Sequence, residues 1–142
     1  MGVQRGKVGF GVYVAGSVVA FGIVLIALQA IGIFTMGMDQ AGLDSLRPAF
    51  ADLWLAANVG GGFAGGFLVA RRRRGEYVLT GLVVGVLAYI FVFAYTLFVE
   101  GVTTDVFAFL CLVFGGVAGS LFFGSRLAGS APKAMPPKAS NP

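Results

Sequence analysis

Residues 58–71 read NVGGGFAGGFLVAR, an apolar and glycine-rich run that ends at the first of four consecutive arginines. Extended back to residue 51, this run reaches the roughly 20 residues that a helix needs to cross the hydrocarbon of a bilayer. The whole chain has the same character, because 58% of its 142 residues are hydrophobic and only 11% are charged. A water-soluble fold of this size cannot bury so much apolar surface. We therefore expect an integral membrane protein.

Three further segments are as long and as apolar as the first. Together the four predict an all-α bundle of transmembrane helices over residues 9–36, 51–70, 77–99 and 105–124. The first segment is too long for the core of a cleaved signal peptide, so we expect it to stay as a membrane anchor. Residues 1–124 would form the membrane domain. Residues 125–142, rich in Pro, Ala and Lys, would form a cytoplasmic tail that is disordered unless a neighbouring subunit holds it.

The charged residues predict the orientation of these spans. Nine of the ten basic residues fall on one side: Arg5, Lys7, Arg71, Arg72, Arg73, Arg74, Arg126, Lys133 and Lys138. The other connections carry Asp39, Asp44, Asp52, Glu100 and Asp105, with Arg47 as the one cation. Because basic loops stay in the cytoplasm, we expect a multi-pass protein of the cell membrane with both termini cytoplasmic.

The run Arg71 to Arg74 is best interpreted as a topology determinant that also touches anionic lipid headgroups. A docking role for protein or nucleic acid is the less favoured alternative. No aromatic residues interleave with these arginines, so base stacking has no support and no nucleic-acid partner is expected.

Small residues four apart give every span a flat face for close helix contact, which must replace the hydrophobic effect in lipid. The faces are formed by Gly16 and Ala20; Ala57, Gly61 and Gly65; Gly62 and Gly66; Gly81 and Gly85; and Gly115 and Gly119. Packing within one bundle is the simplest use of these faces. Contact with another subunit, or a glycine-broken helix that lines a ligand cavity, are the alternatives.

Two of these glycine segments match each other. Residues 61–66, GGFAGG, align with residues 115–120, GGVAGS, and each segment runs toward a basic end. The match suggests a duplicated helical hairpin whose halves are parallel in the membrane. The Gly-Gly-x-Ala-Gly pattern followed by a basic loop, over residues 61–74 and 115–126, resembles small prokaryotic four-span membrane proteins. That resemblance implies the topology and no activity.

Residues that carry chemistry are scarce. The chain has one cysteine, Cys111, and no histidine, which excludes an internal disulfide and the usual zinc and haem ligand sets. No ionisable residue lies near the centre of a span, which disfavours transport coupled to a buried carboxylate. Gln29 and Asn58 are the most suggestive polar residues, either as hydrogen-bonded bridges between helices or as contacts to a substrate or pigment. We expect no enzyme activity, no metal and no cofactor.

The sequence favours a non-catalytic accessory subunit that packs against a larger membrane complex, respiratory or photosynthetic. A homo-oligomeric channel or small-solute transporter, with the glycine segments lining its path, is the first alternative. A lipid- or pigment-binding scaffold is the second, because the phenylalanines of the last two spans offer packing for a quinone or pigment tail. The expected partners are the bilayer and either other membrane subunits or further copies of the chain.

Overall fold

The computed structural model describes residues 9–72, 75–99, 101 and 105–129. Its four helices are α1 (Gly11–Thr35), α2 (Gln40–Arg72), α3 (Tyr77–Val99) and α4 (Val106–Gly129). Each is long and apolar enough to cross a membrane, and the described residues include no strand. The predicted all-α fold of four candidate membrane spans is therefore confirmed. The predictions for Arg5, Lys7, Arg73, Arg74 and residues 130–142 lie outside the described residues.

Two helices extend beyond the predicted spans. α2 begins at Gln40, eleven residues before the predicted start at residue 51, and α4 continues to Gly129 instead of ending at residue 124. The 33 residues of α2 make a rod of about 50 Å, longer than the roughly 30 Å hydrocarbon core, because a helix does not need to stop where the lipid stops. Asp39 supports this early start, since its Oδ1 accepts a hydrogen bond from the Gly42 N–H at 3.0 Å.

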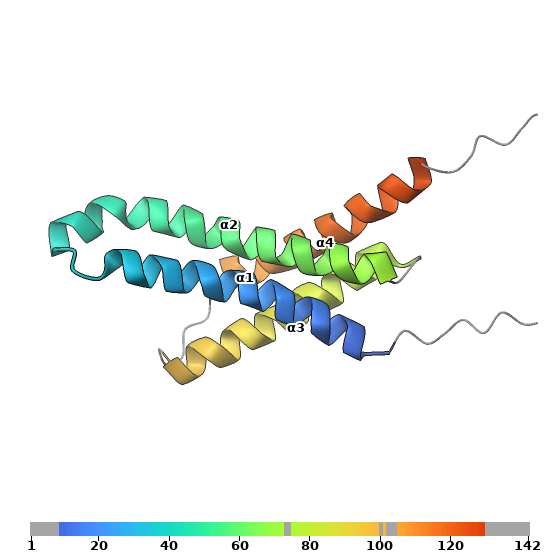
Figure 1. Cartoon of the computed structure of the whole chain (residues 1–142), viewed down its shortest axis with the longest axis horizontal. Helices are drawn as coiled ribbons and strands as arrows, with labels where there is room; N and C mark the ends of the chain where they lie inside the picture. The colour runs from blue at the N-terminus through green and yellow to red at the C-terminus, as the bar shows by residue number, and fades with distance from the viewer. Residues whose placement is uncertain (1–8, 73–74, 100, 102–104, 130–142) are drawn as a thin grey trace, which may run out of the picture.

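A proline lies inside the extended part of α2. Pro48 lacks an N–H and therefore removes one backbone hydrogen bond, which favours a bend in the helix. The first turns of α2 curve away from the axis of the rest of the helix (Figure 1).

Successive helices run in opposite directions, so their ends gather at two ends of the bundle (Figure 1). The start of α1 and the ends of α2 and α4 lie at one end, which we call the Arg71 end. The α1–α2 connection, the end of α3 and the start of α4 lie at the other, which we call the Asp105 end. Asp44 and Arg47 lie in the first turns of α2 and so belong to the Asp105 end.

Small residues and backbone form most of the packed interior. α2 contacts the three other helices and α3 does the same, whereas α1 does not contact α4 within the described residues. The largest buried cluster consists of Ala20, Val24, Ala88, Val92 and Leu112. Because these side chains are small, the helices approach until their backbones touch.

The glycines that lie between helices show how close this approach is. A methyl group at Gly61 would lie 2.7 Å from the carbonyl oxygen of Ala20, and one at Gly65 would lie 2.6 Å from that of Gly16. On α3, a methyl group at Gly85 would lie 2.6 Å from the Cα of Val113. Real Cβ atoms do not occupy such positions, so glycine is required there by a neighbouring backbone that cannot rotate away.

The contact between α2 and α4 has a local two-fold symmetry. Its equivalent residues, 53 positions apart, are Gly62 with Gly115, Gly66 with Gly119, Val59 with Leu112 and Phe63 with Gly116. Gly62 faces the carbonyl oxygen of Leu112, and its equivalent Gly115 faces the carbonyl oxygen of Val59. In the same way, Gly66 faces the carbonyl oxygen of Gly116, and Gly119 faces that of Phe63. Two parallel helices that both carry small residues four apart reach this arrangement when each stripe packs onto the other.

This symmetry differs from the match seen in the sequence. The alignment of residues 61–66 with 115–120 pairs residues 54 positions apart, whereas the helix contact pairs residues 53 apart. The symmetry also stops at α2 and α4, because α1 packs on Gly61 and Gly65 while α3 packs on Gly116. The one-residue difference arises because neighbouring glycines such as Gly61 and Gly62 serve different helices.

Candidate functional site

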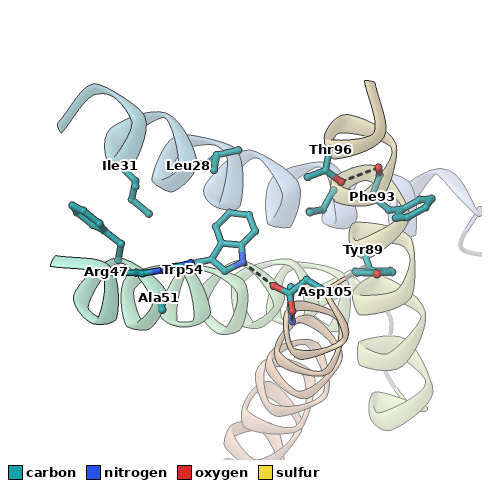
Figure 2. Close-up of a pocket in the computed structure, with 12 residues that line it drawn as sticks. Leu28, Ile31, Arg47, Ala51, Trp54, Tyr89, Phe93, Thr96 and Asp105 are labelled. Atoms are coloured by element: carbon teal, nitrogen blue, oxygen red, sulfur yellow. Dashed lines mark hydrogen bonds between the residues drawn. The ribbon is translucent and has the colours of Figure 1, made fainter. Parts of the chain in front are cut away.

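A cavity of about 480 Å³ lies at the Asp105 end, and all four helices contribute to its wall (Figure 2). Four aromatic side chains line it, Phe50 and Trp54 from α2 and Tyr89 and Phe93 from α3. Aliphatic side chains, including Leu28, Ile31 and Val92, complete most of the rest. This volume falls within the roughly 300–1,000 Å³ of small-molecule sites, and the predominantly apolar lining is typical of them.

The charged side chains of the cavity lie in its outer part. Arg47 and Asp105 lie near the helix ends, and Thr96 lies near the end of α3. Positions farther from the helix ends, such as Trp54, Tyr89 and Val92, are uncharged and aromatic or aliphatic, with the Trp54 N–H and the Tyr89 hydroxyl as their only polar side-chain groups. The cavity therefore has a charged opening and an apolar interior, which suits a molecule with one polar end.

Asp105 connects α2 to α4 at this opening. Its Oδ1 accepts hydrogen bonds from the N–H groups of Phe107 at 3.0 Å and Ala108 at 3.1 Å, so it caps the first turn of α4. Its Oδ2 accepts a hydrogen bond from Trp54 Nε1 at 3.2 Å (Figure 2). Three donors thus fix the orientation of this carboxylate.

Arg47 lies on the opposite side of Trp54 from Asp105 (Figure 2). Its side chain is exposed, and within the described residues no carboxylate forms an ion pair with it. The opening therefore contains one cation and one anion that face the same space without neutralising each other directly.

Gln29 and Asn58, the two polar residues expected to bridge helices, behave differently. Gln29 Nε2 donates to the hydroxyl of Tyr95 at 3.2 Å, so it links α1 to α3 on the exposed surface. Asn58 is fully buried, and its Nδ2 donates to the carbonyl of Trp54 on its own helix at 2.8 Å. Asn58 Oδ1 has no hydrogen-bond partner. Since Asn58 follows Trp54 by one turn of α2, it lies farther from the Asp105 end than Trp54 does.

The predicted packing residues lie mostly between the helices of this chain. Gly16, Ala20, Gly61, Gly65, Gly81, Gly85, Gly115 and Gly119 are buried, and Ala57 is half-buried. None of these residues lines the cavity at the Asp105 end. Gly61, Gly65, Gly115 and Gly119 are closed against neighbouring backbone, so in this conformation they do not border an open path.

Arg71 and Arg72, the described part of the arginine run, are exposed and line a second groove. This groove has a volume of about 880 Å³ and separates the end of α2 from the start of α1, with Gly9, Gly11 and Gly16 on the α1 side. The structure therefore brings two cations of the run beside the first turns of α1.

The sequence patterns do not indicate that one site contains Arg47, Trp54, Tyr89 and Asp105. One signal was available, because Arg47 is the only cation among the acidic connections. The phenylalanines of the last two spans, which the sequence offers as packing for a quinone or pigment tail, differ in their surroundings. Phe98 is 88% exposed, whereas Phe93 lines the cavity and Phe109 packs edge-on against Tyr89 at 5.0 Å.

The described residues contain no group of three His, Cys, Asp or Glu side chains that could hold a metal ion. Comparison with known proteins found no match among family models, curated proteins or solved structures. The cavity at the Asp105 end can bind a small molecule by apolar contact with its walls and by charge interactions and hydrogen bonds with Arg47 and Asp105.

Proposed function

We propose that this chain is a non-catalytic membrane scaffold that holds a lipid-like amphiphile in the cavity at the Asp105 end. The observation that carries the proposal is the polarity gradient of the cavity, with Arg47 and Asp105 at the opening and aromatic and aliphatic walls inside. A molecule with a polar head and an apolar tail satisfies both parts. Because the tail of a membrane lipid leaves hydrocarbon and not water when it enters the cavity, van der Waals packing against the aromatic and aliphatic side chains would hold it.

The proposed location of the ligand is the outer leaflet of the cell membrane. The Arg71 end carries Arg71, Arg72 and Arg126 among the described residues, which supports a cytoplasmic position for that end. The Asp105 end would then face outward, and the opening of the cavity would lie at the level of the lipid headgroups. Both termini would be cytoplasmic.

Native mass spectrometry of the purified chain in a mild detergent tests this function. We expect a lipid-like adduct on the natural chain and its loss in Ala51→Phe, because Ala51 lines the cavity and is exposed enough to accept a larger side chain. Ala56→Phe is the matched control, since Ala56 is exposed on the same helix and does not line the cavity. An adduct retained equally by both variants, or no adduct on any of the three proteins, would count against the proposal.

The same preparation distinguishes a pigment or quinone from a colourless lipid. A pigment would give the purified natural chain visible absorption, and a quinone would give an ultraviolet band that responds to borohydride. Both signals should follow the adduct and disappear in Ala51→Phe if the cavity holds such a molecule.

An accessory-subunit function is a second candidate with a different surface. The glycine faces that suggested it are used within the chain, but a methyl group added at Gly22 or Gly32 on α1 would meet no atom within 4 Å. A partner helix could approach closely at these two positions. Gly22→Leu should then release a partner that co-purifies from the native membrane, and migration of the natural chain as a lone 14.7 kDa protomer would contradict this candidate.

A further inference from the structure

The two charged groups at the opening of the cavity indicate which charges the headgroup of the ligand carries. Arg47 and Asp105 line the same cavity on opposite sides of Trp54 and do not form an ion pair with each other (Figure 2). An anionic head alone would leave Asp105 facing a like charge. A cationic head alone would leave Arg47 facing a like charge.

We propose that the cavity selects a zwitterionic lipid of the phosphatidylethanolamine type, with its phosphate at Arg47 and its primary ammonium at Asp105. This inference rests on the proposed function, and it adds the class of the headgroup. A guanidinium pairs well with phosphate oxygens because its N–H groups match their geometry.

The hydrogen bonds of Asp105 favour a primary ammonium over a choline group. An ionised carboxylate offers about four acceptor positions. The N–H groups of Phe107, Ala108 and Trp54 occupy three of them. One acceptor position therefore remains for an N–H donor, which a primary ammonium has and a trimethylammonium lacks.

Trp54 makes the binding measurable. It is the only tryptophan of the chain, it lines the cavity and it donates to Asp105. Lipids with brominated acyl chains quench tryptophan fluorescence on contact, so their titration into the detergent-purified chain reports occupancy of the cavity. The residual quenching in Ala51→Phe measures the contribution of lipid that merely surrounds the helices.

The experiment compares brominated phosphatidylethanolamine, phosphatidylglycerol and phosphatidylcholine with identical acyl chains. Partly exposed charge pairs contribute up to about 1 kcal/mol, which corresponds to roughly a fivefold change in affinity. We therefore expect phosphatidylethanolamine to bind the natural chain roughly three- to fivefold more tightly than either other lipid.

Two substitutions separate the roles of the charges. Asp105→Asn should abolish the preference for phosphatidylethanolamine over phosphatidylglycerol, while asparagine preserves the helix cap. Arg47→Gln should lower the affinity for phosphatidylethanolamine and for phosphatidylglycerol by a similar factor, because both lipids carry the phosphate. Asp44→Asn, which removes an exposed carboxylate of the same helix that does not line the cavity, should change neither value.

The possible failures are distinct. Equal affinities of the natural chain for the three lipids, with quenching well above the Ala51→Phe baseline, would overturn the headgroup inference and leave the proposed function intact. Quenching no greater than that baseline for every lipid would overturn both. Since the comparison of the three lipids uses the natural chain, it does not depend on the folding of any charge variant.

Discussion

The contact between α2 and α4 makes a sharp prediction about two glycines that lie two positions apart on one helix. A methyl group at Gly62 would overlap the carbonyl oxygen of Leu112 and lie 2.9 Å from the amide nitrogen of Gly116. A methyl group at Gly60 would meet no atom within 4 Å. Gly62→Ala and Gly60→Ala therefore make the same chemical change on the same helix, once against a backbone and once into open space.

The expected magnitude follows from this difference. Both substitutions gain the helix propensity of alanine, so that gain cancels when the two variants are compared. Overpacking of a well-packed interior costs about 1–3 kcal/mol, and the backbone atoms of α4 cannot rotate aside as a side chain would. We expect Gly62→Ala to be about 2 kcal/mol less stable than Gly60→Ala, which is roughly a thirtyfold difference in the ratio of folded to unfolded protein.

Unfolding of the detergent-solubilised chain by increasing mole fractions of sodium dodecyl sulfate measures this difference. Loss of helical circular dichroism and the change in Trp54 emission give two independent signals for the same transition. A Gly62→Ala variant as stable as Gly60→Ala would refute the reasoning, because the helices would then not be held together by backbone contact at that glycine.

Three further predictions address other parts of the fold. Ser17→Ala should lower the free energy of unfolding by about 0.6 kcal/mol, because Ser17 Oγ lies 3.1 Å from a carbonyl oxygen of α3, whereas Ser125→Ala should change it little, since Ser125 is exposed and bonds only within α4. Asn58→Leu should leave stability unchanged or raise it in the same assay, because it removes the unpaired buried Oδ1; a loss above about 2 kcal/mol would indicate a partner for that atom. In a Cys111→Ser background, Arg72→Cys and Asp44→Cys should react with an impermeant maleimide from the cytoplasmic and the external side respectively, and reaction of both from one side would contradict the proposed topology.

Several features of the fold follow from the sequence alone. Four apolar segments separated by charged connections predict four helices, because hydrocarbon leaves a backbone no hydrogen-bond partners other than its own. The small residues four apart predict close helix contact, because only small side chains allow it. The start of α2 and the end of α4 were less predictable, since polar helical turns resemble loops in composition.

The arrangement of the glycine faces was decided by the tertiary structure. Gly61 and Gly62 are neighbours in sequence, yet one faces α1 and the other faces α4. A helix turns by about 100° per residue, so two adjacent stripes point in different directions. Which helix each stripe contacts depends on where the other helices lie. For the same reason, the sequence match between the halves and the symmetry of the helix contact differ by one residue.

The candidate site also depends on tertiary structure. Trp54 and Asp105 are 51 positions apart and become hydrogen-bonded because α2 and α4 run parallel in contact. Taken singly, Arg47, Trp54 and Asp105 suggest an outer loop cation, an interfacial aromatic anchor and a loop carboxylate. Their combination in one cavity depends on helix rotation and packing distance, which hydropathy and charge patterns do not encode.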